Sequence, residues 1–339
     1  MILVTGGTGL LGSHLLFDLV KDGTTVTAIK REESSLSPVE KTFSYYHKNP
    51  ESILKNIIWV DGDVTDIYSL YETFEGVEKV YHAAACLSFD PSDKKQMMLV
   101  NASGTANVVN ACLKKNIKKL CYVSSIATLG RMDHDGLIDE ETHWKNSKKN
   151  SVYSISKYNA ECEVWRGIAE GLPAAIVNPG VIIGPGNPEK GSSRLIDRVW
   201  NGLKFYTPGV NGYVDVRDVS KAMIELMESN ITSERFVLTS ENIDYLTFFS
   251  YVAEALGKKK PGMKASYFAG QLAWRFEKIH VLLAGGNPLI TKETARTAYQ
   301  KYFYSSEKIK KILNFKFMPM EQSIKDTCKL FLKGKGLSQ

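Results

Sequence analysis

The chain has 339 residues, of which 43% are hydrophobic, 24% charged and 10% aromatic. This composition is typical of globular proteins and excludes the disordered, collagen-like and disulfide-scaffold classes. The 43 Lys and Arg exceed the 37 Asp and Glu by six, but they are scattered in pairs and one triple, Lys258–Lys260, so we expect no nucleic-acid partner.

The cysteines, the histidines and the length of the apolar runs indicate which cellular compartment, metal sites and membrane contacts to expect. The five cysteines are widely spaced and mostly embedded in apolar runs, which predicts reduced core thiols in a cytoplasmic protein. No CxxC pair occurs and the six histidines show no ligand spacing, so no metal site is expected. The chain begins with a strand pattern rather than a secretory signal, and its apolar run at 281–290 is too short to span a bilayer, so no membrane partner is expected.

The first thirty residues predict a strand, a helix and a second strand. Ile2–Val4 is an apolar run, an apolar stripe follows over Leu10–Val20, and Thr25–Ile29 is the next strand. The alternation continues with strands at 57–60, 79–83, 120–124 and 174–178 and helices at 67–74, 100–114 and 153–170. Val- and Ile-rich strands that alternate with helices indicate an α/β fold, in which a doubly wound parallel sheet of the Rossmann class is covered on both faces.

After residue 180 the alternation loosens into loops that contain Gly and Pro. A short strand is predicted at 236–239, and helices at 246–256 and 268–283. We therefore expect a nucleotide-binding domain at 1–180, with segments near 210–240 completing its sheet. A smaller, mostly helical substrate-binding lobe at 181–339 is expected to be discontinuous.

A glycine-rich segment, Thr5-Gly6-Gly7-Thr8-Gly9-Leu10-Leu11-Gly12, joins the first strand to the first helix. Gly6 allows a tight turn, Gly9 lets backbone N–H groups approach a pyrophosphate, and Gly12 lets the helix pack close to the strand. The helix N-terminus adds about half a positive charge toward the anion. The segment predicts a dinucleotide site that includes Thr5, Gly6, Thr8, Gly9, Leu10 and Leu11, although its GxxGxxG spacing differs from the general GxGxxG fingerprint.

The end of the second strand selects between the two nicotinamide dinucleotides. NAD-binding folds place an acid there, on the ribose 2′-hydroxyl. Here the residues are Lys30 and Arg31, and an Arg side chain grips a 2′-phosphate that a carboxylate would repel. NADP(H) is therefore favoured, and NAD(H) stays the alternative because Glu32 and Glu33 follow immediately. The small residues Ala83, Ala84 and Ala85 after the fourth strand fit a flat cofactor lying against the backbone.

Tyr153 and Lys157 lie one helical turn apart, on one face of the helix predicted at 153–170. A free phenol has a pKa near 10 and exchanges protons poorly at neutral pH. An ammonium about 4 Å away is worth about 4 kcal/mol at an effective dielectric constant of ~20, which would bring the pKa toward ~7, the range that a general acid or base needs. Ser124 and Ser125, at the end of the strand before this helix, add hydroxyls that can reach a substrate carbonyl.

Together these motifs resemble the extended short-chain dehydrogenases/reductases of the NAD-dependent epimerase/dehydratase superfamily. The sequence is most similar to the branch that contains dihydroflavonol reductases and 3β-hydroxysteroid dehydrogenases. The stretches that carry this resemblance are VSSIATLG at 123–130, NPGVIIGPG at 178–186 and YVDVRDV at 213–219. The motifs from Thr5 to Gly186 cover more than half of the chain.

The resemblance implies a catalytic role for each matching residue. Tyr153 would give a proton to the carbonyl oxygen as hydride arrives from the nicotinamide. Lys157 would lower the pKa of Tyr153 and hold the nicotinamide ribose, and Ser125, rather than Ser124, would bind the developing alkoxide. Asn101 matches an Asn near the family's active site, with helix capping as the alternative.

Further cofactor contacts also follow from the resemblance. Asp63 would contact the adenine amino group, with a helix cap before Ile67 as the alternative. The remaining positions expected to border the dinucleotide are Val64, Ser124, Pro179, Gly180 and Val181, of which the last three would flank the nicotinamide. A homodimer formed through helices on one face of the sheet is compatible with the same resemblance.

Within the superfamily the residues favour a reductase. Sugar-nucleotide dehydratases carry Thr-Asp-Glu after the catalytic strand, whereas residues 125–128 contain no carboxylate. We therefore expect NADP(H)-dependent reduction of a bulky, hydrophobic ketone or aldehyde to an alcohol, in a pocket lined by Cys86–Phe89 and Tyr267–Trp274 unless those aromatics form the core of the lobe. The alternatives are an NAD-dependent nucleotide-sugar epimerase and a non-catalytic NADP-binding module.

Overall fold

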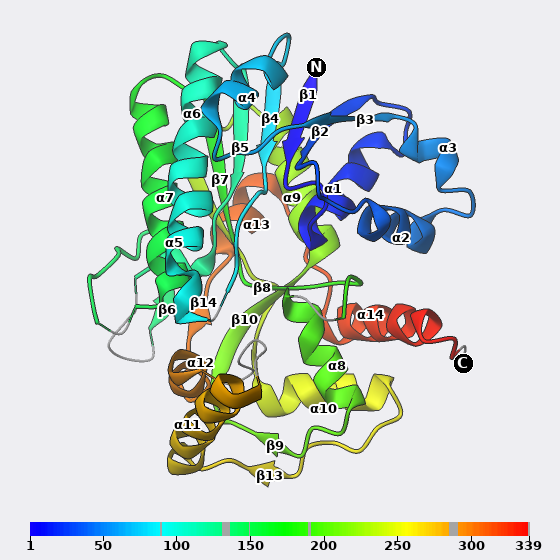
Figure 1. Ribbon diagram of the computed structural model, residues 1–339, viewed down its shortest axis with the longest axis vertical. Helices are drawn as coiled ribbons and strands as arrows, with labels where there is room; N and C mark the ends of the chain where they lie inside the picture. Colours follow the sequence, from blue (N-terminus) through cyan, green and yellow to red (C-terminus); the bar gives the residue numbers. More distant parts are fainter. Residues whose placement is uncertain (89, 131–135, 149, 189–190, 285–290, 338–339) are drawn as a thin grey trace.

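A computed structural model of the chain describes residues 1–88, 90–130, 136–148, 150–188, 191–284 and 291–337 (Figure 1). Phe89 and the end of the apolar run at 281–290 lie outside the described residues. Figure 1 shows an upper part built on a large sheet and a lower part built on a smaller one. No helix among the described residues has the length and apolarity needed to cross a bilayer.

The upper part is built on seven parallel strands in the order β11-β7-β5-β4-β1-β2-β3. The strands are β1 (Ile2–Thr5), β2 (Val26–Lys30), β3 (Ile57–Asp61), β4 (Lys79–His82), β5 (Lys119–Val123), β7 (Ala174–Pro179) and β11 (Glu234–Leu238). The chain runs outward from β1 to β3, then returns to β4 on the other side of β1. Parallel strands with this reversal confirm the doubly wound Rossmann fold.

Helices cover both faces of this sheet, and each face has its own apolar core. One face carries α1 (Leu10–Val20), α2 (Ser37–Tyr46), the short α3 (Glu51–Leu54) and α9 (Val216–Glu228). The other face carries α4 (Ile67–Thr73), α6 (Gly104–Lys114) and α7 (Val152–Ala169) (Figure 1). Residues of the central strands are almost fully buried, as expected when both faces are covered.

The predicted strands of residues 1–180 are confirmed to within one residue at each end. The helix expected at 100–114 starts earlier, because α5 (Lys94–Met97) and the π-helical turn η2 (Met98–Ser103) run directly into α6. The expectation of loops after residue 180 is wrong at α9, which packs on α1. Val216, Val219, Met223 and Leu226 form the buried stripe of α9, a period that is visible in the sequence.

The expected sheet-completing region near 210–240 divides between the two sheets. The strand predicted at 236–239 is β11, at the edge of the large sheet. By contrast, β10 (Val210–Asp215) pairs with β8 (Val181–Ile183) and β12 (Glu241–Asp244) in a separate three-stranded sheet. The segments that form the lower part are therefore interrupted in the sequence, since β11, between β10 and β12, belongs to the seven-stranded sheet.

The lower part packs helices around the small sheet. Its core contains stacked Tyr213 and Phe248, whose ring centroids are 4.7 Å apart. The helices are α8 (Arg194–Trp200), α10 (Tyr245–Ala255), α11 (Tyr267–Ala284), α12 (Lys292–Thr297) and α14 (Met320–Gly334), while α13 (Glu307–Leu313) lies against β11. Short two-residue strands complete it: β9 (Phe205–Tyr206) pairs with β13 (Met263–Lys264), and β14 (Phe303–Tyr304) pairs with β6 (Leu137–Ile138).

Candidate active site

The glycine loop lies at the carboxyl end of β1, beside β4, where the strand order reverses. Gly6 has φ +73°, and a Cβ there would lie 2.5 Å from the backbone nitrogen of Ala84. A Cβ on Gly12 would lie 2.1 Å from the Gly6 carbonyl oxygen. Both positions therefore require glycine, which confirms the tight turn expected at Gly6 and the close packing expected at Gly12.

The N-terminus of α1 presents free backbone donors at this edge. Gly9 is the N-cap residue, and neither a capping side chain nor an acid in the first turn covers the N–H groups that follow it. Thr8 and Leu10 are half-buried in the loop, and Leu11 is buried. A helix start of this kind carries a partial positive charge suited to a pyrophosphate, so the geometry fits the predicted dinucleotide.

The two basic residues at the end of β2 differ in their surroundings. The Lys30 ammonium forms an ion pair with Asp61, which is its register partner on β3. The Arg31 guanidinium is more than half exposed and lies 3.2 Å from the Glu33 carboxylate. Of the pair, Arg31 is therefore the residue with donors available for a 2′-phosphate.

Asp63 follows β3 at the same edge, and its carboxylate accepts hydrogen bonds from the backbone N–H and the hydroxyl of Thr65, both at 2.8 Å. It does not cap the helix before Ile67, since Asp66 is the N-cap of α4 and accepts from the Tyr68 N–H at 2.9 Å. The capping alternative for Asp63 is thus wrong. Val64 is buried in the core below Asp63.

The three alanines after β4 lie next to the glycine loop. Ala83 N–H donates to the Thr5 carbonyl at 3.2 Å, and Ala84 N–H donates to the Thr5 hydroxyl at 3.3 Å. Ala84 is the residue that Gly6 touches, and Ala85 is exposed. Small side chains therefore keep the backbone open at this point.

Ser125 and Tyr153 meet beyond the end of β5. Ser125 begins the short turn η3 (Ile126–Thr128), and its hydroxyl accepts from the Ala127 N–H at 3.1 Å. Tyr153 lies in the first turn of α7, and its phenol lies close enough to the Ser125 side chain for that contact to favour a lower pKa of the phenol. Ser124 instead points into the protein and donates to Glu161. This difference supports Ser125, rather than Ser124, as the serine of the site.

Lys157 is one turn along α7 from Tyr153, but its ammonium contacts other groups. Nζ donates to the Tyr122 hydroxyl and to the Val123 carbonyl, both at 2.7 Å. Burial lowers the pKa of Lys157 to about 7, and burial raises the pKa of Tyr153 although its contact with Ser125 opposes this. The expected fall of the Tyr153 pKa toward 7 is therefore wrong for these residues alone, because desolvation of the phenol dominates and the Lys157 ammonium bonds to Tyr122 and Val123 instead.

A chain of hydrogen bonds behind Lys157 joins three strands. The Tyr122 hydroxyl lies near Thr105, the Thr105 hydroxyl lies 3.0 Å from His82 Nε2, and His82 Nδ1 lies 2.6 Å from the Thr5 hydroxyl. Burial and the nearby lysine lower the pKa of His82 to about 3, so its ring is neutral at pH 7. Sequence reasoning missed this chain, because its members are single polar residues within apolar strands and, at Thr105, within helix α6.

Glu161 is one turn beyond Lys157 on α7 and is only 2% exposed. One carboxylate oxygen accepts from Thr128 at 2.7 Å and from the Asn178 amide at 2.8 Å, and it also takes the Ser124 bond. The other oxygen lies 3.0 Å from Arg235. Sequence reasoning missed this carboxylate as well, although its i, i+4 spacing from Lys157 was a usable signal.

Asn101 is fully buried and joins two parts of the site. Its side chain accepts from the Cys86 N–H at 2.7 Å and donates to the Cys86 carbonyl and the Ser156 hydroxyl, both at 2.9 Å. Asn101 lies inside η2, not at a helix start, so the capping alternative is wrong. It is a positioning residue that fixes the segment after β4 against α7.

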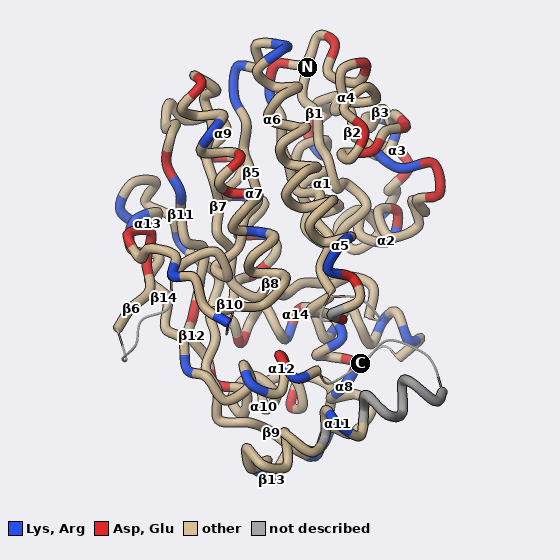
Figure 2. Tube along the Cα trace, turned by 60° about the vertical axis from the view of Figure 1, so that its left-hand side comes forward, with Lys and Arg blue, Asp and Glu red and all other residues tan. Residues whose placement is uncertain are grey.

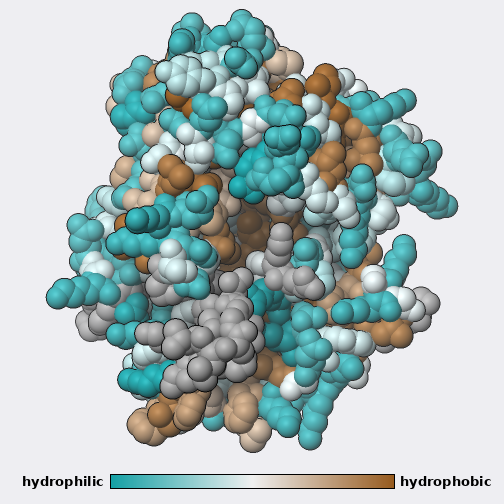
Figure 3. Space-filling model, in the orientation of Figure 1, coloured by the Kyte–Doolittle hydropathy of each residue, from teal (hydrophilic) through white to brown (hydrophobic). Residues whose placement is uncertain are grey.

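Pro179, Gly180 and Val181 connect β7 to β8 at the same edge of the sheet. Figure 3 shows a hollow with an apolar floor near the centre of this face, where Figure 1 places the carboxyl ends of β1 and β4 above β8. The glycine loop, the segment after β4 and this connection therefore converge on one depression. The first two supply backbone donors and small side chains, as a bound dinucleotide requires.

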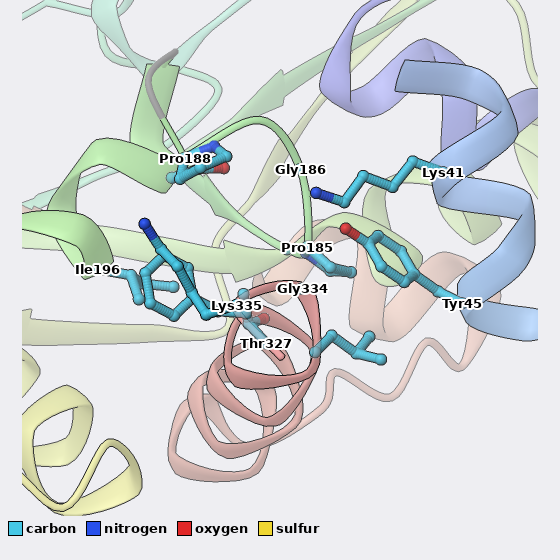
Figure 4. A pocket seen from close by; sticks show the side chains of 13 residues that line it. Lys41, Tyr45, Pro185, Gly186, Pro188, Ile196, Thr327, Gly334 and Lys335 are labelled. Atoms are coloured by element: carbon cyan, nitrogen blue, oxygen red, sulfur yellow. The ribbon is translucent and has the colours of Figure 1, made fainter. Parts of the chain in front are cut away.

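Two other cavities lie away from this hollow. One, of about 40 Å³, lies between α2, the loop after β8 and α14, with Lys41, Tyr45, Pro185 and Lys335 around it (Figure 4); it has room for a few waters only. The other, of about 520 Å³, is lined by residues that include Trp144, Tyr158 and Arg235. Neither contains Ser125 or Tyr153. Among the described residues no group of His, Cys, Asp or Glu is arranged to hold a metal ion.

The first two aromatic residues of the segment Tyr267–Trp274 lie on the protein surface. The segment lies in α11, where Tyr267 is 54% and Phe268 is 72% exposed. These two side chains are therefore neither lobe core nor enclosed pocket wall. In the other expected lining segment, Cys86 and Ser88 are half-buried and Leu87 is exposed.

The lowered pKa of Lys157 predicts a pH-dependent rate. The ammonium form, which would stabilise negative charge left on Tyr153 after proton donation, exists below the pKa of about 7. We expect kcat for carbonyl reduction to fall about tenfold for each pH unit above that value. Steady-state rates at saturating cofactor and substrate, between pH 6 and pH 9, test this, and a rate that stays flat to pH 9 contradicts it.

Comparison with known proteins adds the family context of this geometry. The sequence pattern of the NAD dependent epimerase/dehydratase family matches residues 2–238. A putative dihydroflavonol 4-reductase from Synechocystis is 26% identical, over 97% of this chain and 93% of its own length. Tetraketide alpha-pyrone reductase 2 from Arabidopsis thaliana is 30% identical, over 76% of this chain and 82% of its own length. The crystal structure of gox2253 superimposes with a TM-score of 0.80 at 27% identity, over 100% of this chain and 99% of that one.

Proposed function

This chain belongs to the NAD dependent epimerase/dehydratase family of extended short-chain dehydrogenases/reductases, and we propose that it is an NADP(H)-dependent reductase of a bulky, hydrophobic ketone or aldehyde. The observation that carries this proposal is the approach of the Tyr153 phenol to the Ser125 side chain, beside buried Lys157 at the carboxyl edge of the sheet. Its reductase relatives, the putative dihydroflavonol 4-reductase and tetraketide alpha-pyrone reductase 2, support the same reaction class.

The residues divide the work of carbonyl reduction among them. A bound nicotinamide dinucleotide supplies the reducing equivalent. Tyr153 gives its proton to the carbonyl oxygen, the Ser125 hydroxyl donates a hydrogen bond to the same oxygen as negative charge develops there, and Lys157 stabilises the charge left on Tyr153. The glycine loop and the N-terminus of α1 would hold the pyrophosphate.

The preference for NADP(H) rests on Arg31. Because Lys30 is ion-paired with Asp61, we expect Arg31→Ala to raise the KM for NADPH by about 10- to 100-fold and to leave the KM for NADH nearly unchanged, since a hydrogen bond to a charged group is worth about 1.5–3 kcal/mol. Lys30→Ala is the matched control, with a smaller effect expected. Equal losses for both cofactors in Arg31→Ala would contradict this preference.

The substrate class is inferred from the lining of the hollow. Its floor is apolar (Figure 3). A sugar-nucleotide dehydratase would need a carboxylate in the turn η3 that follows Ser125, and this turn carries none. The proposed partner is thus a small carbonyl compound with an extended apolar body.

All five cysteines are free thiols, three of them buried, which supports a reducing, cytoplasmic compartment.

The purified protein with NADPH and a panel of aromatic and alicyclic ketones tests the proposal. We expect loss of nicotinamide absorbance with hydrophobic ketones and none with UDP-sugars. Interconversion of UDP-sugars with no net change of cofactor would indicate an epimerase. Cofactor binding without turnover on either class would indicate a non-catalytic module, and both results would overturn the proposal.

A further inference from the structure

Helix α11 turns an apolar face to solvent, the reverse of the usual amphipathic pattern. Phe268, Leu272 and Phe276 follow one another at intervals of four residues, so they share one face, and they are 72%, 40% and 69% exposed. The opposite face packs against the protein: Gly270 lies against the ring of Tyr299, with a Cβ position 3.1 Å from its hydroxyl. The three apolar side chains therefore lie on the solvent-facing side of α11 and not on the side that packs against the protein.

The exposed apolar surface continues onto the strands next to α11. Met263 on β13 and Phe205 on β9 are register partners, 48% and 55% exposed, and Tyr267 at the start of α11 is 54% exposed. Figure 1 places β9, β13 and α11 together at the end of the molecule farthest from the N-terminus. We call this surface the α11 tip: Phe205, Met263, Tyr267, Phe268, Leu272 and Phe276.

Positive charge is concentrated around the α11 tip. Residues 254–277 contain five basic residues and two acidic ones, which stand at the two ends of this segment. The basic residues are Lys258, Lys259, Lys260, Lys264 and Arg275, all exposed, and Lys204 lies beside Phe205. Figure 2 shows basic positions along this end of the trace. Among the described residues, Lys260 of this group forms an ion pair, with Glu254 at 3.1 Å, and the Lys258 ammonium lies over the Trp200 ring.

We propose that the α11 tip docks on the surface of a bilayer that carries anionic lipids. Aromatic and aliphatic side chains on one helix face, bordered by Lys and Arg, are the composition of interfacial segments, whose apolar side enters the boundary between headgroups and acyl chains. Each cation next to an anionic surface strengthens binding by roughly fivefold. The sequence expectation of no membrane partner rests on the length of apolar runs, which bears on crossing a bilayer and not on lying upon it.

The charge pattern argues against a second copy of the chain as the occupant. A twofold contact through the α11 tip would place the lysines of one copy beside those of the other, and like charges across an interface are unfavourable. Lys is also depleted in protein–protein interfaces. Anionic headgroups, in contrast, neutralise the same lysines while the aromatic side chains leave water.

Flotation of the full chain with lipid vesicles tests this proposal. We expect binding to vesicles of phosphatidylcholine containing one-third phosphatidylglycerol, with weaker binding to phosphatidylcholine alone and at high salt. The variant F268S/L272S/F276S is expected to bind the anionic vesicles at least tenfold more weakly, and K259E/K264E to lose most of the preference for anionic lipid. The matched control I58S/Y68S/I312S replaces three exposed apolar side chains elsewhere and is expected to bind as the parent does.

Unfolding midpoints and NADPH binding, measured on each variant, separate a docking defect from a folding defect. Absence of binding to anionic vesicles overturns the proposal, as does equal binding by F268S/L272S/F276S and its control. A parent dimer in sedimentation that this variant converts to monomer would assign the tip to a second copy instead. None of these measurements needs turnover, so the proposal and the reductase function fail separately.

Discussion

Replacing Tyr153 with Phe is expected to lower kcat for ketone reduction by about a thousandfold, within the 10²- to 10⁴-fold that a positioned general acid contributes. The ring stays in the first turn of α7, so its packing is retained, while the phenolic hydroxyl that lies beside the Ser125 side chain is removed. The KM for NADPH is expected to change little, because the phenol would act on the substrate oxygen. Single-turnover rates with saturating NADPH measure the chemical step directly.

Tyr158→Phe is the matched control for this change. Tyr158 lies on the same helix, and its ring stacks on Trp144 with centroids 4.5 Å apart, so the same deletion of a hydroxyl occurs outside the site. We expect kcat of this variant to stay within a factor of two to three, in keeping with the small effect of most surface substitutions. If Tyr153→Phe retained more than about a tenth of the parent rate, proton donation by that phenol would be refuted.

Sequence patterns could predict the frame of this site because the frame depends on local chemistry. The turn at Gly6 and the close packing at Gly12 follow from the absence of a Cβ, and the alternation of strands and helices follows from periodicity. Tyr153 and Lys157 share a helix face because of their spacing alone. These features need no knowledge of what lies across the fold.

The features that sequence patterns did not predict depend on contacts between distant segments. Lys157 bonds to Tyr122 and Val123, on a strand more than thirty residues earlier, so its lowered pKa could not follow from the i, i+4 pair. The sequence does not distinguish Arg31 from Lys30 as a phosphate ligand, yet Asp61 on the neighbouring strand forms an ion pair with Lys30 and not with Arg31. Burial and pairing therefore decide the chemistry that residue type leaves open.

Glu161 carries the second large effect, because its carboxylate holds the turn next to the catalytic serine. Thr128 and Asn178 both bond to Glu161, and the same two side chains lie 2.9 and 3.2 Å from the Ser125 carbonyl. Arg235, 18% exposed, pairs with the other carboxylate oxygen and also donates to the Glu140 carbonyl. Glu161→Leu would remove the carboxylate partner of this largely buried guanidinium and the acceptor that Thr128 and Asn178 share, and we expect it to lower the free energy of unfolding by about 3–5 kcal/mol.

Glu161→Gln separates the positioning role from stability alone. The amide keeps the shape but removes the charge that raises the pKa of Lys157, so the fall of kcat with rising pH should begin below pH 7 instead of near it. Denaturant unfolding and the pH profile of kcat are the two measurements. Glu163→Gln is the control, since Glu163 is half-exposed and pairs with Arg166 at 2.8 Å, an interaction worth about 0–1 kcal/mol. An unshifted pH profile in Glu161→Gln would show that this carboxylate supports the fold without acting on Lys157.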